Sequence, residues 1–473
     1  MLRQRERKGN VVLHEDIVAG INPQVRIADD SGEMDGAVFR GAIRNAAAAL
    51  NDAQPAPWEP VIVPISNRGA DLASLIAVLQ AGCVAVPLHR NAAATTRQAA
   101  FDLVKPRFSL ELSEAGPTLT QLADAPPPAR PLLESAALVV FTSGSTGAPK
   151  GVVVGAGQFR AKLAQIEARL GWRRGMRVFA PLQLTFVFGQ WVSFLTLITG
   201  GSLQLSSRFD PAATLARLRA GEITGLAAVP TMLRALLAER GAPIARPFLL
   251  VTGGETLSPA VGATLGEAFP AARIADLYGL SETTSCDFFN EGAAFTAQLG
   301  TIGRPGPGVE AQVDAATGEL LIRTPYLMKG YLDRPDLTQA ALSGGWFRTG
   351  DMAEIAPSGA VRLIGRLKEL INRGGNKVAP MEVEGVFAAH PAVRVCLATG
   401  AADAQRGEAI HLVVVSTGPN RPDPAELRDW ARGRLEPWKL PDHIHFAEAI
   451  PLGATGKADR LALRRMIETG ALD

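Results

Sequence analysis

The sequence has few cysteines and almost no net charge. Its 473 residues include three cysteines, Cys83, Cys286 and Cys396, which lie far apart without a CxxC pair or a histidine spacing that would build a zinc site. This cysteine usage fits a reducing, cytoplasmic setting. The formal net charge of +2 provides no protein-wide field for nucleic acid or an anionic membrane, so we expect no nucleic-acid partner.

Long apolar runs are also missing. The charged stretch MLRQRERKGN is followed by VVLHEDIVAG, which has neither the apolar core nor the cleavage site of a signal peptide. The longest apolar stretch, from Trp191 to Gly200, is interrupted by Ser193 and two threonines and is too short to cross a bilayer. We therefore expect a soluble protein without membrane insertion.

The length and the composition predict a globular protein of at least two domains. Between residues 36 and 87, helical patterns alternate with short apolar strands such as EPVIVPIS and CVAVPL, an order that favours a layered α/β fold. The proline-rich segment near residues 122 to 131 reads as a connector. Shorter strands with turn signals near Gly300 predict a small β subdomain, and the segments after GAVRLIGR predict a compact α+β domain.

A loop rich in glycine and hydroxyl groups lies between two apolar runs that we predict to be strands, in the segment LVVFTSGSTGAPKGVVV from Leu138 to Val154. Glycines let backbone N–H groups converge on an anion, hydroxyl groups donate hydrogen bonds, and Lys150 adds positive charge. The loop therefore predicts a polyphosphate site. The residues expected to bind phosphate are Thr142, Ser143, Gly144, Ser145, Thr146, Gly147 and Lys150.

Two other interpretations of this loop exist. A Walker A loop has glycine directly before its lysine, Ser or Thr directly after it and then a helix, whereas here Pro149 precedes Lys150 and Gly151 follows it. A polar surface hairpin without a ligand is the second alternative.

The segment TSGSTGAPKG resembles the phosphate-loop signature of the adenylate-forming (AMP-binding) superfamily, which includes acyl- and aryl-CoA synthetases, peptide-synthetase adenylation domains and firefly-type luciferases. Further motifs follow in the family's order, so the resemblance covers nearly the whole chain. It implies a large N-terminal α/β adenylation domain of layered sheets with a small β subdomain, over residues 1–367. It also implies a smaller, mobile α+β C-terminal domain over residues 368–473.

The segment from Tyr278 through Gly279 to Glu282 and Thr283 resembles a family motif. The resemblance implies that the tyrosine stacks on adenine, the glutamate helps to hold Mg²⁺ and the threonine contacts the α-phosphate. An aromatic face suits a purine, and a carboxylate suits Mg²⁺. Alone, Glu282 could merely favour a helix N-terminus and Tyr278 could be a core residue. The turn Gly253-Gly254-Glu255 similarly resembles the family's adenine-pocket turn.

Four more positions follow from the resemblance. Asp351, at the end of GWFRTGD, would accept hydrogen bonds from the ribose hydroxyls, and Arg366 would contact ribose and phosphate. Lys368 falls at the family's interdomain hinge. Lys457, in PLGATGKADR, corresponds to the catalytic lysine, whose ammonium would hold the substrate carboxylate and stabilise developing charge. Each residue alone could be an ordinary surface charge.

The acyl group and the thiol have weaker sequence signals. Gly374 and Gly375 resemble the face that meets the pantetheine arm, although a tight turn would explain both. The segment PLQLTFVFGQ contains no acid, which argues against an amino-acid substrate, and FVFG looks like aryl-CoA ligases of the benzoate type. We expect an apolar pocket for an aromatic or medium-length aliphatic acid. Its candidate residues are Phe186, Phe188, Gly189 and Gln190.

The resemblance implies an acid-thiol ligase. It would use ATP and Mg²⁺ to convert a small-molecule carboxylic acid into an acyl-adenylate, release pyrophosphate, and then form a thioester with coenzyme A as co-substrate. We expect a monomer or a homodimer. Two alternatives stay open: a ligase that loads the phosphopantetheine thiol of an acyl carrier protein, and a relic that binds nucleotide without turnover.

Overall fold

The computed structural model describes residues 13–143, 149–452 and 458–472, with the backbone alone described at Ser143. The chain forms two compact units. The first comprises Met1–Ala311 and Ile322–Phe347, and the second comprises Gln312–Leu321 and Arg348–Asp473. Lys368 lies inside the second unit, in the 3-10 helix η6 (Leu367–Glu369). The domain boundary between residues 367 and 368 stays a prediction.

A nine-stranded sheet forms one layer of the first unit, in the order β15-β14-β13-β12-β11-β9-β10-β1-β2. Its inner strands are parallel, and β2, β14 and β15 add to the edges in the antiparallel sense. Inner strands are apolar because both faces are covered. The strands are β1 (Arg26–Asp29), β2 (Gly32–Asp35), β9 (Arg177–Ala180), β10 (Ser202–Leu205), β11 (Gly225–Ala227), β12 (Leu249–Gly253), β13 (Arg273–Tyr278), β14 (Phe288–Glu291) and β15 (Arg304–Pro305).

A seven-stranded sheet forms a second layer of the first unit, in the order β18-β8-β7-β4-β3-β5-β6. Strands β7 and β8 pair in the antiparallel sense, and the glycine-rich loop joins them. The strands are β3 (Pro60–Ile65), β4 (Val84–His89), β5 (Phe108–Ser113), β6 (Gly116–Gln121), β7 (Ala136–Ser143), β8 (Pro149–Gly155) and β18 (Gly330–Tyr331). The two predicted strands are therefore confirmed, and residues 144–148 of the loop between them lie outside the described part of the chain.

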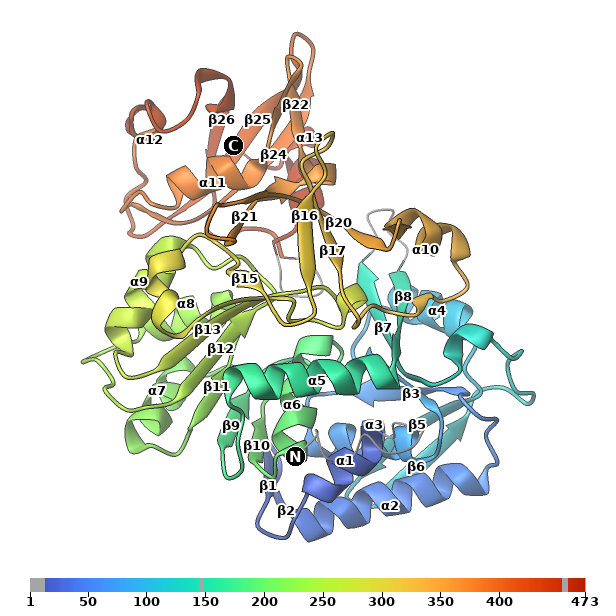
Figure 1. The fold of residues 1–473 in the computed structure, drawn as a ribbon. Helices are drawn as coiled ribbons and strands as arrows, with labels where there is room; N and C mark the ends of the chain where they lie inside the picture. The colour runs from blue at the N-terminus through green and yellow to red at the C-terminus, as the bar shows by residue number, and fades with distance from the viewer. Residues whose placement is uncertain (1–12, 144–148, 453–457, 473) are drawn as a thin grey trace. The chain divides into compact units, whose positions relative to one another are not determined.

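Helices cover these two sheets (Figure 1). The helices of the first unit are α1 (Leu13–Gly20), α2 (Gly36–Asp52), α3 (Gly69–Gln80), α4 (Ala94–Val104), α5 (Ala156–Leu170), α6 (Val187–Ile198), α7 (Pro211–Ala220), α8 (Pro230–Ala238), α9 (Pro259–Ala268) and α10 (Pro335–Ala341). Several have recognisable ends. Asp210 caps the first turn of α7, Pro211 occupies its first position, and Gly221 closes it with a φ of 75°.

Helix α5 positions part of the candidate site. It follows β8 directly and ends where Gly171 adopts a φ of 66°. Phe159 and Ile166 recur at helical spacing on its buried face, and Lys162 lies on the same face with no exposed surface. Helix α5 packs against α6, β7 and β8 (Figure 1).

A five-stranded sheet is formed by residues 310–366, the part of the sequence in which the chain changes from the first unit to the second. Its strand order is β16-β17-β20-β19, and β21 pairs with β20. It corresponds to the predicted β subdomain. Its strands are β16 (Glu310–Val313), β17 (Glu319–Arg323), β19 (Leu342–Ser343), β20 (Trp346–Ile355) and β21 (Val361–Arg366).

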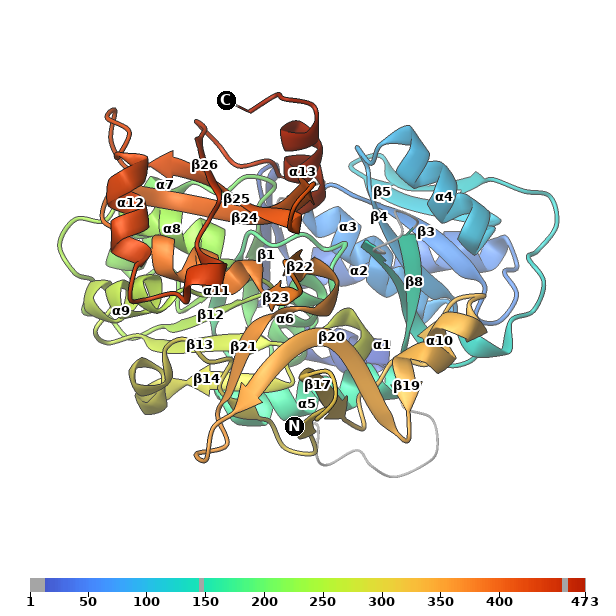
Figure 2. The ribbon, with the colours of Figure 1, turned by 90° about the horizontal axis from the view of Figure 1, so that it is seen from above.

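The second unit has its own sheet and hydrophobic core, as the predicted α+β domain requires. The sheet order is β23-β22-β25-β24, with β26 parallel to β25, and Figure 2 shows the helices of this unit around β24 and β25. The elements are β22 (Ile371–Arg373), β23 (Asn376–Val378), α11 (Pro380–Phe387), β24 (Val393–Asp403), β25 (Gly407–Ser416), α12 (Pro424–Ala431), β26 (His443–Phe446) and α13 (Arg460–Glu468).

The predicted fold class is confirmed: a large N-terminal α/β portion of layered sheets precedes a smaller α+β unit. Among the described residues, none of the helices combines the length and the apolar character that crossing a bilayer requires.

Candidate active site

The glycine-rich loop is held at both ends by the β7–β8 ladder. Thr142 pairs with Lys150 across the two strands, and Ser143 pairs with Pro149. A strand follows the lysine, whereas a Walker A loop leads into a helix, so that alternative is excluded. Lys150 places its Nζ 4.8 Å from the centre of the Tyr331 ring. The predicted phosphate ligands Gly144, Ser145, Thr146 and Gly147 lie outside the described residues.

The turn after β13 carries the predicted adenine and magnesium residues. Strands β12 and β13 are parallel neighbours, so their carboxyl ends lie at the same sheet edge, where ligands of open α/β sheets bind. Tyr278 is half-buried and meets Phe288 edge to face, with ring centroids 5.7 Å apart. A Cβ on Gly279 would lie 2.2 Å from the backbone nitrogen of Cys286. The turn can fold back on itself only because residue 279 has no side chain.

Glu282 has the chemistry of a magnesium ligand. The Tyr331 hydroxyl donates a 2.8 Å hydrogen bond to its Oε1, and Oε2 has no hydrogen-bond partner in the described part of the chain. Burial and the neighbouring Glu282 carboxylate raise the pKa of Tyr331, which keeps its hydroxyl protonated as a donor. Mg²⁺ commonly binds one or two carboxylates and completes its shell with phosphates and water. Glu282 therefore fits the predicted ion.

The surroundings of Thr283 do not favour its predicted phosphate contact, which stays a prediction. Its side chain is fully buried, and its hydroxyl contacts Oδ2 of Asp287 and the carbonyl oxygen of Leu280. The hydroxyl therefore points into the protein, not toward a phosphate. Ser281, two residues earlier in the same turn, is partly exposed. Both residues fit a phosphate contact chemically, and the burial of Thr283 makes Ser281 the more accessible hydroxyl of the turn.

The turn after β12 is shaped by glycine and closed by Glu255. A Cβ on Gly253 would lie 2.5 Å from the carbonyl oxygen of Leu277, and Gly254 has a φ of 81°. Glu255 accepts hydrogen bonds from the backbone N–H of Thr231 at 3.1 Å and from its hydroxyl at 2.7 Å. The glutamate thus anchors the turn to the start of α8, while its assignment to an adenine pocket stays a prediction.

Sequence reasoning missed Asp276, which lies in β13 two residues before Tyr278. Across the sheet it is aligned with Thr252 on β12 and Asn290 on β14. Burial raises the pKa of Asp276 to about 7, so the native state favours its protonated form below neutral pH. In the sequence, the acidic residue inside the otherwise largely apolar run RIADLY could have indicated a buried carboxyl group.

The predicted ribose residues lie in the second unit. Asp351 on β20 is aligned with Arg366 on β21, and Nε of Arg366 lies 2.9 Å from Oδ1 of Asp351. Asp351 is buried and Arg366 is exposed. Gly350 donates its backbone N–H to Oε1 of Glu319 at 2.8 Å, which fixes the strand next to Asp351. The structure brings these two residues together as a charged pair, and their contact with ribose stays a prediction.

The remaining predicted residues of the second unit lie in turns. Gly374 and Gly375 join β22 to β23 with φ values of 58° and 85°, as a two-residue hairpin turn requires, so the turn itself accounts for both glycines. Lys368 is exposed in η6. Lys457 lies outside the described residues. The roles of these four residues in thiol binding, hinge motion and catalysis stay predictions.

The predicted acyl-pocket residues lie at the start of α6, and they differ in exposure. Phe186 and Phe188 are half-buried, and the Phe188 ring stacks on Trp191 with centroids 5.5 Å apart. Gly189 leaves no room for a side chain, since a Cβ would lie 2.4 Å from the carbonyl oxygen of Gln183. Gln190 is fully buried and donates to the carbonyl oxygen of Leu184 at 2.9 Å. The two phenylalanines remain the better pocket candidates, because Gln190 supports the turn before α6.

A layered α/β unit with a glycine-rich hairpin loop and a Tyr-Gly-Leu-Ser-Glu turn, followed by a small α+β unit, defines an adenylate-forming protein. The chain belongs to the AMP-binding enzyme family. The family model matches residues 25–332, and the model of the AMP-binding enzyme C-terminal domain matches residues 382–457. The resemblance inferred from the motifs is thereby confirmed.

Curated relatives include CoA ligases. The chain is 31% identical over 431 residues to a feruloyl-CoA synthase from Amycolatopsis sp, covering 84% of this chain and 87% of that protein. It is 30% identical over 347 residues to a 2-succinylbenzoate–CoA ligase from Geobacillus kaustophilus, covering 71% and 70%. A solved amide bond synthetase from Marinactinospora thermotolerans superimposes with a TM-score of 0.84 at 27% identity, covering 96% of this chain and 99% of that one.

Proposed function

We propose that this protein is an acid-thiol ligase that activates a carboxylic acid with ATP and transfers the acyl group to coenzyme A. The family assignment and the CoA ligases among its relatives support this activity. The observation that carries it is the Glu282 carboxylate, held by Tyr331 beside Lys150 at the base of the glycine-rich loop.

In the first step, an oxygen of the substrate carboxylate attacks the α-phosphorus of ATP, and the bond to the departing pyrophosphate breaks. Bound Mg²⁺ would neutralise charge on the phosphates, with Glu282 as its protein ligand. Lys150 and the hydroxyl groups of the loop bind phosphate, and Ser281 is the hydroxyl of the 278–283 turn placed to do the same. Lys457 holds the substrate carboxylate against the nucleotide.

In the second step, the thiol loses its proton and the sulfur attacks the acyl carbon. The carbon–oxygen bond to AMP then breaks, AMP leaves and a thioester remains. The face around Gly374 and Gly375 meets the pantetheine arm, and a change of orientation at Lys368 brings it into place.

The preferred acid is aromatic or of medium length and apolar. Phe186 and Phe188 contribute aromatic surface, and the segment 181–190 contains no acidic residue that could pair with an amino group. The similarity to a feruloyl-CoA synthase supports an aromatic acid, and hydroxycinnamates are the first compounds to try.

Pyrophosphate release with Mg·ATP tests the proposal. The panel contains ferulate, benzoate, 4-hydroxybenzoate, 2-succinylbenzoate, octanoate and alanine, each with and without coenzyme A. Release that depends on an aromatic acid, that coenzyme A accelerates and that Lys457→Ala abolishes is the expected result. Lys105→Ala, which removes an exposed lysine of the first unit, is the matched control and should keep full activity.

The acceptor is tested in the same assay. The solved amide bond synthetase supports an amine as the second candidate acceptor, so amines are added in place of coenzyme A. Acyl-adenylate that only an amine or a phosphopantetheinyl carrier protein consumes would overturn coenzyme A as the acceptor. Nucleotide binding without pyrophosphate release from any acid would overturn the enzymatic proposal altogether.

A further inference from the structure

The turn that follows Glu282 has an unusual backbone. Thr284, Ser285 and Cys286 are three consecutive residues other than glycine with left-handed φ values of 59°, 69° and 50°. Such a conformation costs on the order of 1 kcal/mol or more per residue and persists only where the surroundings impose it. Some interaction must therefore hold this turn against its own backbone preference.

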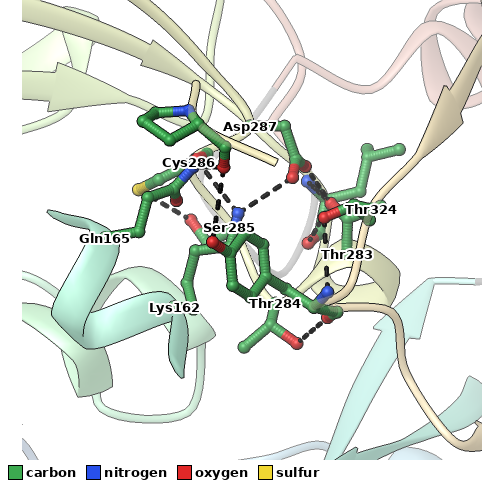
Figure 3. A network of polar contacts seen from close by, with 11 residues as sticks. Lys162, Gln165, Thr283, Thr284, Ser285, Cys286, Asp287 and Thr324 are labelled. Carbon is green, nitrogen blue, oxygen red and sulfur yellow. Dashed lines mark hydrogen bonds and ion pairs between the residues drawn. The ribbon is translucent and has the colours of Figure 1, made fainter. Parts of the chain in front are cut away.

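A buried lysine from a distant element supplies that interaction. Nζ of Lys162, on α5, donates to the carbonyl oxygen of Cys286 at 3.1 Å and to Oδ1 of Asp287 at 2.9 Å (Figure 3). The same Nζ lies 4.3 Å from the centre of the Tyr326 ring. The side chains of Lys162 and Asp287 both have no exposed surface. One ammonium group thus binds the last residue of the strained turn and the residue that follows it.

Asp287 closes the turn from its other end. Its Oδ2 accepts the hydroxyl of Thr283, the residue directly before the strained segment (Figure 3). Burial raises the pKa of the Asp287 carboxyl, while Lys162 and the Thr283 hydroxyl favour its charged form. The carboxylate is therefore a shared acceptor that ties the beginning of the turn to its end.

Further hydrogen bonds connect the turn to the predicted magnesium ligand. The Thr284 hydroxyl donates to the carbonyl oxygen of Tyr326 at 2.6 Å, and the backbone N–H of Met328 donates to the carbonyl oxygen of Glu282 at 2.7 Å. The segment 326–328 is therefore hydrogen-bonded both to Thr284 and to Glu282. A shift of residues 283–287 would displace Ser281 and Glu282.

Stability alone is a weak reason for this ion pair. Removing a lysine and an aspartate from water is costly, and well-packed apolar residues in place of a buried pair are often neutral or stabilising. The contact with the strained turn therefore explains better why a lysine lies on the apolar face of α5.

We propose that Lys162 and Asp287 are positioning residues for the nucleotide site: they hold the 283–287 turn so that Ser281 and Glu282 face Mg·ATP. This inference rests on the proposed function, in which Glu282 binds the ion. The pair acts on Glu282 through the backbone of the turn, so its loss should weaken metal binding toward the lower end of the about 10- to 100-fold range known for groups bonded directly to a metal ligand.

The test measures ATP binding by calorimetry across a Mg²⁺ titration, together with thermal unfolding. Lys162→Met keeps the side chain as far as Cε and removes the charged Nζ. It should raise the Mg²⁺ concentration needed for half-maximal ATP binding by about tenfold. Arg107→Met is the matched control, because it also leaves a buried carboxylate, Glu59, without its cation in the same unit. The control should lose thermal stability without any change in Mg²⁺ dependence.

A neutral double variant separates positioning from stability. Lys162→Met with Asp287→Asn leaves no unpaired charge, so it should regain most of the unfolding temperature and fold even where the single variant does not. It should keep the raised Mg²⁺ requirement, because methionine cannot donate to Cys286. Recovery of both properties in the double variant would assign the pair to stability alone and overturn the inference.

The readout is independent of turnover. If the unaltered protein binds Mg·ATP but releases no pyrophosphate with any acid, the proposed function fails while the positioning role is still measured. Unchanged Mg²⁺ dependence in a folded Lys162→Met protein would overturn the positioning role and leave the proposed ligase activity standing.

Discussion

Both units hold charged side chains largely away from solvent, and they do so for different structural purposes. In the first unit, Lys162 and Asp287 form a pair of single charges that holds three residues of irregular backbone. In the second unit, Arg460 uses its planar guanidinium to bridge two carboxylates. Its Nη1 and Nη2 lie 2.7 and 3.0 Å from the two oxygens of Glu384, and its Nε lies 2.8 Å from Oε2 of Glu369.

The guanidinium cluster joins regular elements. Arg460 begins α13, Glu384 lies on α11 and Glu369 lies in η6, while the backbone N–H of Ala398 on β24 also donates to Glu384 at 2.7 Å. A forked guanidinium suits such a junction, because it presents several donors in one plane. A lysine suits the turn in the first unit, because its single ammonium group can donate both to the carbonyl oxygen of Cys286 and to the carboxylate of Asp287. The comparison predicts that loss of Arg460 lowers stability alone, whereas loss of Lys162 lowers stability and also raises the Mg²⁺ concentration needed for ATP binding.

The largest stability effect in the second unit is expected for Arg460→Met. It leaves Glu384, whose side chain is only 17% exposed, without its cation, and the cost should approach the about 3–5 kcal/mol found when a buried pair loses one partner. Urea unfolding, with hydrogen exchange followed on β24 and β25, measures the loss. Arg464→Met is the control, since Arg464 is partly exposed and pairs with Glu468 and Glu408. It should cost less than about 1 kcal/mol. Equal losses in the two variants would remove the distinction between a junction and a surface pair.

An intermediate effect is expected from the two hydroxyls of the 281–283 turn. Thr283→Val preserves shape but leaves Oδ2 of Asp287 without its donor, which should cost about 1–3 kcal/mol of unfolding free energy. Ser281→Ala should change stability by less than about 0.5 kcal/mol and instead slow adenylate formation. Thermal unfolding and pyrophosphate exchange, measured on both variants, distinguish the roles. A stable Thr283→Val protein with slow exchange would restore the direct phosphate role for that residue.

The smallest effect is a pH dependence in the second unit. Burial, with His443 and His445 nearby, lowers the pKa of His411 from 6.5 to about 4, although Asp442 and Asp403 act in the opposite direction. The folded state keeps His411 neutral while the unfolded chain binds a proton, so stability is lost as pH falls from about 6.5 toward 4. Because Asp442 and Asp403 offset part of this penalty, we expect a loss of about 1 kcal/mol.

His411→Gln removes this titration. Unfolding followed between pH 7 and pH 4 should show a shallower loss of stability for His411→Gln than for the unaltered protein. His89→Gln replaces an exposed histidine of the first unit and should leave the slope unchanged. A slope that His411→Gln does not alter would place the acid sensitivity elsewhere in the chain.

The sequence predicted local features well, because they depend on neighbouring residues. Two short apolar runs predicted β7 and β8, and the glycine and hydroxyl content between them predicted a loop. The order of the motifs predicted the family, and the break after GAVRLIGR predicted a second α+β body. The alternative explanation offered for Gly374 and Gly375, a tight turn, also agrees with their backbone angles.

Other features were out of reach because they depend on contacts between distant residues. Lys162 and Asp287 are 125 positions apart, and Tyr331 and Glu282 are 49 apart. The helical periodicity of α5 does place Lys162 on its apolar face, and a lysine at such a position indicates a buried ion pair. No pattern in the sequence, however, names the partner of that lysine.

The sequence by itself determined the fold class, the glycine-rich hairpin loop and the family, because these follow from short-range periodicity and from motifs read in order. The tertiary structure alone decided which hydroxyl of the 281–283 turn is buried, which tyrosine supports Glu282 and which lysine holds the strained backbone. The physical reason is that burial and pairing of polar groups are set by the packing of separate elements, and each buried charge selects its partner only when those elements meet.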